Sequence, residues 1–354
     1  MNTIIRFLKS LFLIDLLKGL GLYDRNQPVD GEDLAKTDWK KVAERLAKQL
    51  TNDTKPDDWS KYKELVIVPD GVLWYLPFEI LQVPAKEGTE SILAKLPVRY
   101  APTLALSVPD KRPIKRATRT AVITGKMVPR EEDSLTRLAT EQIGGIADVS
   151  LLGETLPTPS AVFTAACDRF VLFADLEDQD KLPFGWSPAK LDAGKGGSTL
   201  SEWSLLPFAG AEQVVFPGFH TPAESSLKRG GTGEEVFLSV CGLMASGSRT
   251  ILLSRWRVGG QSTVELMREF VQELPHSPAN IAWRRSVELA SARLIDPAAE
   301  PRLRAGKSAD GLKADHPFFW AGYLLVDTGV GPPPEEPAAK PAEKAVAGGG
   351  ESKP

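Results

Sequence analysis

The sequence is poor in the residues that build disulfide-stapled, metal-binding or nucleic-acid-binding proteins. Its 354 residues include two cysteines, Cys167 and Cys241, and three histidines. Two cysteines cannot form a disulfide framework, and no Cys-x-x-Cys spacing offers a zinc site. A formal net charge of −3 gives no basic excess for a nucleic-acid footprint. We therefore expect no metal, no cofactor and no nucleic-acid partner, and a reducing cytoplasmic location.

A long uninterrupted apolar run is also missing. Residues 1–23 are apolar enough to raise the question of a membrane, but Arg6, Lys9, Asp15 and Lys18 interrupt them. A spanning helix needs roughly 20 mainly apolar residues, and Asp15 would fall inside the apolar core of a signal peptide. We expect a helix that packs on the domain or on a partner protein. A helix that lies on a membrane surface is the alternative.

Short apolar runs separated by helical patterns make up most of the remaining chain. The apolar runs are residues 65–68, 121–124, 170–174, 213–216, 250–254 and 323–326. Apolar residues recur at helical spacing in residues 38–50, and further helices are expected at 234–245, 262–274 and 281–294. Alternating strands and helices predict an α/β fold, with a mainly parallel sheet and helices on both faces.

The composition predicts three parts along the chain. Residues 1–30 form an N-terminal apolar helix and linker, 31–330 a globular domain, and 331–354 a tail. The tail has no aromatic residue and one large aliphatic residue, Val346. It buries too little apolar surface to offset the entropy of ordering, so we predict that it is disordered.

Five motifs follow one another between residues 65 and 327. They are LVIVPDGVLWYLPFEIL at 65–81, YAPTL at 100–104, GEE at 233–235, TILLSRWRV at 250–258 and HPFFWAG at 316–322. Together they resemble the CHAT domain, a caspase- and separase-like module that is often found beside tetratricopeptide repeats. The resemblance implies a caspase-like three-layer sandwich over 31–330, with a peptidase-related site at the carboxyl edge of the sheet.

Peptidases of this clan place a histidine at the end of one strand and a cysteine at the end of the next. The resemblance aligns the histidine strand with VLFADLE at 171–177 and the cysteine strand with VVFPGFHT at 214–221. Leu176 then stands at the histidine position and Phe219 at the cysteine position. Neither side chain can take a proton or attack a carbonyl, so we predict that the catalytic pair is lost. Gly260 also stands where the family often carries an acidic residue.

A few other residues could carry chemistry. His220 is the candidate base of a relocated site, with Ser225 or Ser226 as the nucleophile, and a polar loop residue is the alternative. Asp70 is expected to bond its own backbone within the Pro-Asp-Gly turn, and His316 to pack or cap. Both cysteines are expected to be buried structural thiols. The four acidic residues between 175 and 180 are expected to form a solvated loop, with a docking site for a basic partner as the alternative.

These residues lead to three hypotheses. The first is a catalytically inactive CHAT-type pseudo-peptidase that acts as a protein-interaction or regulatory module in bacterial signalling or defence. Its partner would be a repeat protein or an active paralogue, bound through the surface around the inactive cleft. The second is an active cysteine- or serine-type endopeptidase with a relocated nucleophile. The third is a membrane-surface adaptor anchored by residues 1–23.

Overall fold

The computed structural model describes residues 13–20, 28–51, 55–111, 119–128, 132–152, 167–177, 187–188, 210–219, 233–304 and 312–329. The predicted disordered tail, 331–354, lies outside these residues, as do His220, Ser225 and Ser226.

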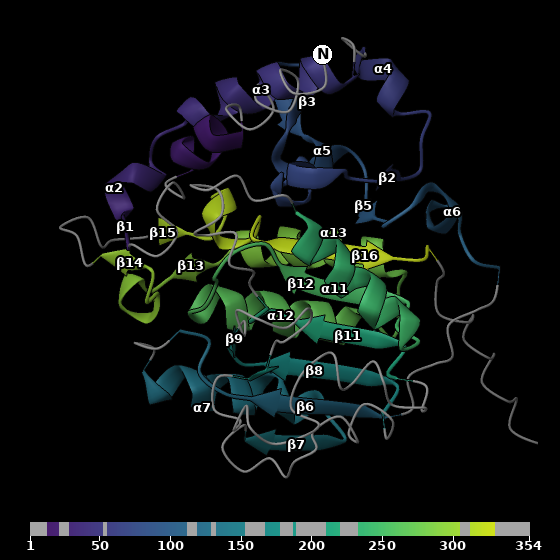
Figure 1. Ribbon diagram of the computed structural model, residues 1–354. Helices are drawn as coiled ribbons and strands as arrows, with labels where there is room; N and C mark the ends of the chain where they lie inside the picture. The colour runs from purple at the N-terminus through teal and green to yellow at the C-terminus, as the bar shows by residue number, and fades with distance from the viewer. Residues whose placement is uncertain are drawn as a thin grey trace, which may run out of the picture.

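An eight-stranded sheet runs through the molecule (Figure 1). Neighbouring strands are parallel except for the antiparallel pair β12–β16. All six predicted apolar runs lie in strands of this one sheet, which confirms the predicted mainly parallel architecture. In spatial order, the strands are β2 (Leu65–Ile67), β5 (Val98–Tyr100), β16 (Tyr323–Asp327), β12 (Thr250–Ser254), β11 (Gln213–Phe216), β8 (Arg169–Phe173), β6 (Thr120–Thr124) and β7 (Val149–Leu152).

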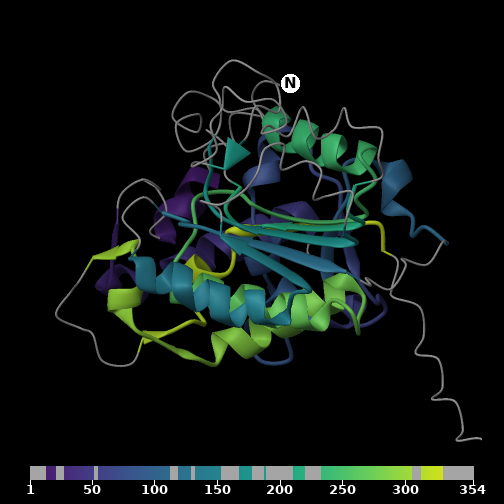
Figure 2. The same ribbon diagram turned by 90° about the horizontal axis from the view of Figure 1, so that it is seen from below.

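Helices cover both faces of the sheet, as Figure 2 shows from its edge. Helix α11 (Glu234–Ala245) lies on one face, and α7 (Asp133–Gln142), α12 (Gln261–Glu273) and α13 (Ala279–Ser291) lie on the other. The helices predicted at 38–50, 234–245, 262–274 and 281–294 are confirmed as α3 (Asp38–Thr51), α11, α12 and α13. The last one begins two residues earlier than predicted and ends at Ser291, because Leu294 belongs to a short strand.

Shorter elements surround the sheet. Four two-stranded sheets pair β1 (Val29–Asp30) with β14 (Leu303–Arg304), β3 (Gln82–Pro84) with β4 (Thr89–Ser91), β9 (Leu176–Glu177) with β10 (Ser187–Pro188), and β13 (Leu294–Ile295) with β15 (Leu312–Lys313). Short α-helices are α2 (Gly31–Leu34), α4 (Pro56–Trp59), α5 (Ile92–Lys95) and α6 (Leu104–Ser107). The 3-10 turns are η1 (Gly71–Tyr75), η2 (Phe78–Ile80), η3 (Gly144–Ile146), η5 (Pro297–Ala299) and η6 (Pro317–Phe319).

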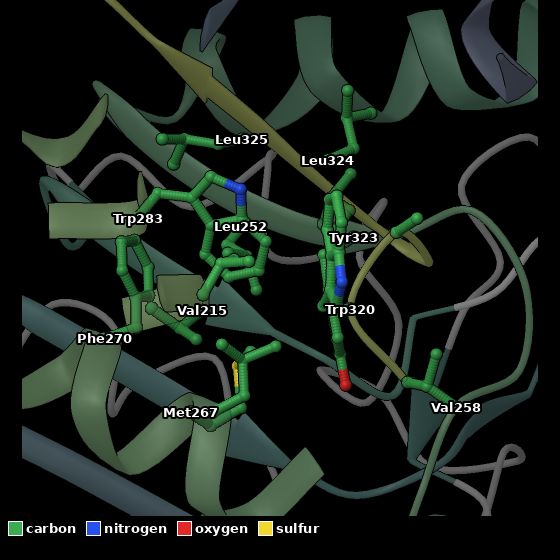
Figure 3. Packing of buried hydrophobic residues seen from close by; sticks show 14 of the residues in the cluster. Val215, Leu252, Val258, Met267, Phe270, Trp283, Trp320, Tyr323, Leu324 and Leu325 are labelled. Atoms are coloured by element: carbon green, nitrogen blue, oxygen red, sulfur yellow. The ribbon is translucent and has the colours of Figure 1, made fainter. Parts of the chain in front are cut away.

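The core on the α12–α13 face is built from alternating strand residues and helix aromatics (Figure 3). The ring of Trp283 packs edge-on against Phe270 at 5.5 Å and against Tyr323 at 5.7 Å between ring centroids. Val215 and Leu252, paired across β11 and β12, are fully buried beside them. Side chains on one face of a strand alternate with those on the other, so the same strands also bury residues beneath α11.

The N-terminal helix packs within the molecule. Residues 13–19 are helical, and Leu13, Leu16, Leu17 and Leu20 are all buried. They belong to the same core as Trp39 of α3 (Asp38–Thr51). The expectation of a helix packed on the domain is therefore confirmed for its described part. In the part of the chain that the structure describes, every helix is too short or too polar to cross a membrane.

Candidate functional site

Four of the five sequence motifs meet around one buried arginine, Arg255, which follows β12. Its guanidinium donates to Glu79 Oε2 at 3.2 Å and to the Tyr100 hydroxyl at 2.6 Å. It also donates to the main-chain oxygens of Ala321, at 3.0 Å, and Tyr323. Arg255 and Tyr100 are fully buried, and Glu79 nearly so. A buried charge is stable only when it is paired and hydrogen-bonded, as it is here, so these motif residues serve the framework.

The fifth motif, GEE at 233–235, joins the same framework through α11. The Tyr75 hydroxyl donates to Glu235 Oε1, and the rings of Trp74 and Phe237 lie 6.3 Å apart. Asp70, in the turn before η1, caps through its main-chain oxygen, which accepts from the Leu73 amide at 3.2 Å. Its side chain makes no cap bond, so the expected side-chain-to-backbone bond is wrong.

The carboxyl ends of β8 and β11 touch each other, main chain against main chain. A Cβ atom on Gly218 would overlap the carbonyl oxygen of Ala174 and lie 3.1 Å from the Asp175 amide nitrogen. Only glycine fits this approach. The two strand ends that would flank a peptidase cleft therefore meet directly.

Phe219, at the predicted nucleophile position, lies inside the core. It has no exposed surface, and its amide closes a turn by donating to Phe216 O at 3.1 Å. Its carbonyl oxygen accepts a hydrogen bond from the buried Ser254 hydroxyl. The Ser254 hydroxyl, at the end of β12, thus holds the main chain of Phe219 in place.

Leu176, at the predicted base position, lies in β9 and pairs with Pro188 of β10. The residue before it, Asp175, is 4% exposed and lies 3.5 Å from the Arg257 guanidinium. For Asp175, the expectation of a solvated acidic loop is wrong, because its carboxylate is buried and forms an ion pair with Arg257. A buried carboxylate needs such a partner. This ion pair lies at the carboxyl edge of the sheet, where Asp175 follows β8 and Arg257 follows β12.

A buried carboxylate lies where Gly260 lacks a side chain. Gly260 has a φ of 93°, and a Cβ atom on it would lie 2.7 Å from Glu300 Cδ. Glu300 is 2% exposed and accepts from the amide and hydroxyl of Ser262, at 2.6 and 3.0 Å. It thereby satisfies one free N–H group at the start of α12, that of Ser262, which a glycine N-cap cannot do. An acid is present at this place, but it comes from a segment distant in sequence.

The remaining candidate nucleophiles and bases are structural. Burial raises the pKa of Cys167 to about 12 and that of half-buried Cys241 above its ordinary value, so both thiols stay protonated at neutral pH. His316 Nδ1 accepts from the Phe318 amide at 3.1 Å, and burial lowers the pKa of His316 to about 4. The buried position expected for Cys167 and the capping role expected for His316 are confirmed, whereas Cys241 is only partly buried.

His220, Ser225 and Ser226 lie outside the described residues, so the relocated site stays a prediction. Among the residues that the structure describes, no cluster of histidine, cysteine or acidic side chains could hold a metal ion.

The family model of the CHAT domain matches residues 34–184 and 196–328. The chain belongs to the CHAT family. A search of curated proteins finds no match to it. The mainly parallel sheet with helices on both faces agrees with the caspase-like fold of CHAT domains.

In this CHAT domain, the two residues predicted at the dyad positions, Leu176 and Phe219, carry no group that can exchange a proton. The placement of the dyad at Leu176 and Phe219 stays a prediction, and sequence reasoning missed Gly218, Arg257 and Glu300. The Pro-Gly pair at 217–218 was a weak signal of a tight turn at the strand end. Glu300 gave no signal, since it lies 38 positions from its partner Ser262.

Proposed function

We propose that this CHAT domain is a catalytically inactive pseudo-peptidase that acts as an interaction or regulatory module in a bacterial signalling or defence system. The contact between Gly218 and Ala174 is the observation that carries the proposal. A clan peptidase needs space between these strand ends for a substrate carbonyl. Here the main chains of Gly218 and Ala174 approach so closely that no side chain fits at position 218.

The chemistry of the dyad supports the same proposal. A base–nucleophile pair works by holding a deprotonated attacker within about 3 Å of the carbonyl. Phe219 offers neither an attacking atom nor access, because it is fully buried. A histidine at position 176 and a cysteine at position 219 would therefore not by themselves give a substrate access to these strand ends.

A protein partner suits this domain better than a membrane surface. The leucines of residues 13–20 are buried in the molecule's own core, so their apolar face is not free to enter a bilayer. We propose a repeat protein or an active paralogue as the partner, and the cytoplasm as the location, in line with the setting of CHAT domains beside tetratricopeptide repeats.

The test is peptidase activity of the purified chain. We expect wild type to leave peptide libraries uncut and to remain unlabelled by cysteine-directed covalent protease probes. The matched variant, Leu176→His with Phe219→Cys, should also stay inactive, since Gly218 still blocks the edge. Cleavage by wild type that disappears in His220→Ala would establish the competing function, an endopeptidase with a relocated site.

A further inference from the structure

One edge of the large sheet is open. β7 is the outermost strand, and among the residues that the structure describes it pairs with β6 alone (Figure 1). The Asp148 amide donates to Thr120 O of β6 at 2.9 Å. Main-chain groups of successive strand residues point to alternate sides, so those of Val149 and Leu151 point away from β6. In the described part of the chain these outward groups make no hydrogen bond, and such a row is a template for another strand.

β7 lacks the features that protect an edge strand. Its sequence, Val-Ser-Leu-Leu at 149–152, has no lysine, no proline and no charge. The charged residue before it, Asp148, is already engaged, because its carboxylate accepts from the Thr120 amide at 2.6 Å. Natural sheets charge, shorten or cover their edges to prevent pairing with another chain. The uncharged edge of β7 therefore indicates a surface that accepts a strand.

The outward groups of β7 are complementary to themselves. In an antiparallel pair of strands, directly opposite residues can exchange two hydrogen bonds. When Val149 lies opposite Leu151 of a second copy, Leu151 also lies opposite Val149 of that copy, and each of these two pairs exchanges two bonds. Ser150 then lies opposite Ser150 of the second copy on a two-fold axis, with the Cα atoms roughly 4.5 Å apart. One surface thus serves both chains, as a symmetric dimer requires.

The side chains suit the same register. Side chains alternate between the two faces of a strand, and Ser150 lies on the face of η3, where a Cβ added to Gly144 would meet its hydroxyl first. Val149 and Leu151 lie on the other face, partly buried against the core. The pairing places Val149 against Leu151 of the second copy, an apolar cross-strand contact that stabilises a sheet.

The other edge of the sheet offers less. In β2, the Leu65 amide donates to Pro97 O and Ile67 O accepts from the Ala101 amide, both on the side of β5. Val66 is then the one residue of β2 whose main-chain groups point outward, against two such residues in β7. Pairing between copies is therefore expected at β7.

We propose that a second copy of this chain pairs with β7 in antiparallel register, so that the two eight-stranded sheets continue across a two-fold axis at Ser150. This inference goes beyond the proposed interaction role and does not depend on the strand ends at Gly218. A strand of four residues forms a small interface, and interfaces below about 1,200 Å² are weak and transient. The dimer should therefore form reversibly, in a fraction that rises with protein concentration.

The experiment introduces charges at the axis. Sedimentation equilibrium of the full chain should show the 38.5 kDa monomer in exchange with its dimer. Ser150→Lys and Ser150→Glu each place like charges opposite one another, so each variant alone should raise the dimer Kd by roughly fivefold or more. An equal mixture of the two should restore the dimer, because opposite charges then meet. Restoration by mixing is specific to a residue that faces itself.

A disulfide gives a second measurement. Residues that face each other at the axis are close enough for a disulfide bond, so Ser150→Cys in a Cys241→Ala background should form a covalent dimer under mild oxidation. The remaining cysteine, Cys167, is buried. Gly145→Cys in the same background, at an exposed position in η3, is the matched control and should give no covalent dimer.

The variants at Ser150 and Gly145 change exposed positions, so an unchanged melting temperature confirms their fold. The proposal is overturned by a wild-type chain that stays monomeric at the highest soluble concentration, by a dimer that Ser150→Lys leaves unchanged, or by a mixture that stays monomeric. Equal covalent dimer from Ser150→Cys and Gly145→Cys would also overturn it. Peptidase activity is a separate readout, so failure of the proposed function is recognised independently.

Discussion

Gly218 is the residue whose replacement tests the closed strand edge most directly. Gly218→Ala forces a methyl group into the carbonyl of Ala174, and we expect a loss of about 2–4 kcal/mol in the free energy of unfolding. Urea denaturation measures it. Gly145→Ala is the control, since no atom lies within 4 Å of its added Cβ, and it should change stability by less than about 1 kcal/mol. Equal stabilities would show that the edge is open in solution.

His316 makes the stability of the protein depend on pH. Burial lowers its pKa from 6.5 to about 4, so between these values the unfolded chain binds a proton that the native chain does not. The free energy of unfolding should therefore fall by up to about 3 kcal/mol as the pH drops from 6.5 to about 4.

The variant His316→Asn keeps an acceptor for the Phe318 amide and should flatten this dependence, measured as the urea midpoint at several pH values between 7 and 4. The exposed His276, changed to asparagine, is the control and should leave the dependence in place. A dependence that survives in His316→Asn would assign it to other groups.

At the scale of elements, α12 depends on a carboxylate from outside the helix. Glu300→Ala leaves the buried amide and hydroxyl of Ser262 without their acceptor, and we expect a loss of about 1–3 kcal/mol. Glu288→Ala, on the exposed side of α13, should cost no more than about 0.5 kcal/mol. Thermal unfolding compares the two. Similar costs would mean that water replaces the Glu300 carboxylate.

The elements also show how far the sequence alone leads. Buried five-residue strands, such as β8 and β12, are visible as mainly apolar runs because both faces are covered by helices. The three-residue β5 contains Arg99, whose charge hides the strand until its partners Glu64 and Ser107 are known. The predicted dyad positions follow from the resemblance, because the family places them relative to strand ends. The contact of Gly218 with Ala174 could not be predicted, since it depends on how two strand ends approach in space.

At the scale of the whole molecule, the eight-stranded sheet and its helices should account for the stability. Removal of residues 331–354 is expected to leave the melting temperature nearly unchanged, because that composition offers almost no side chain for a core. Differential scanning calorimetry of the full chain and of the truncated chain is the measurement. A drop of more than a few degrees, about 1 kcal/mol for a protein of this size, would show that the segment docks on the domain.

β16 leaves the ribosome after every other strand of the large sheet. β2 and β5 lie on one side of it, and the five strands from β12 to β7 lie on the other. Both parts are therefore synthesised before the strand that joins them. Until residues 323–327 emerge, β5 and β12 each present an open edge, the kind of surface through which nascent chains pair wrongly with one another. The emergence of β16 thus closes two open strand edges at once, and the chain is most prone to wrong pairing just before that step.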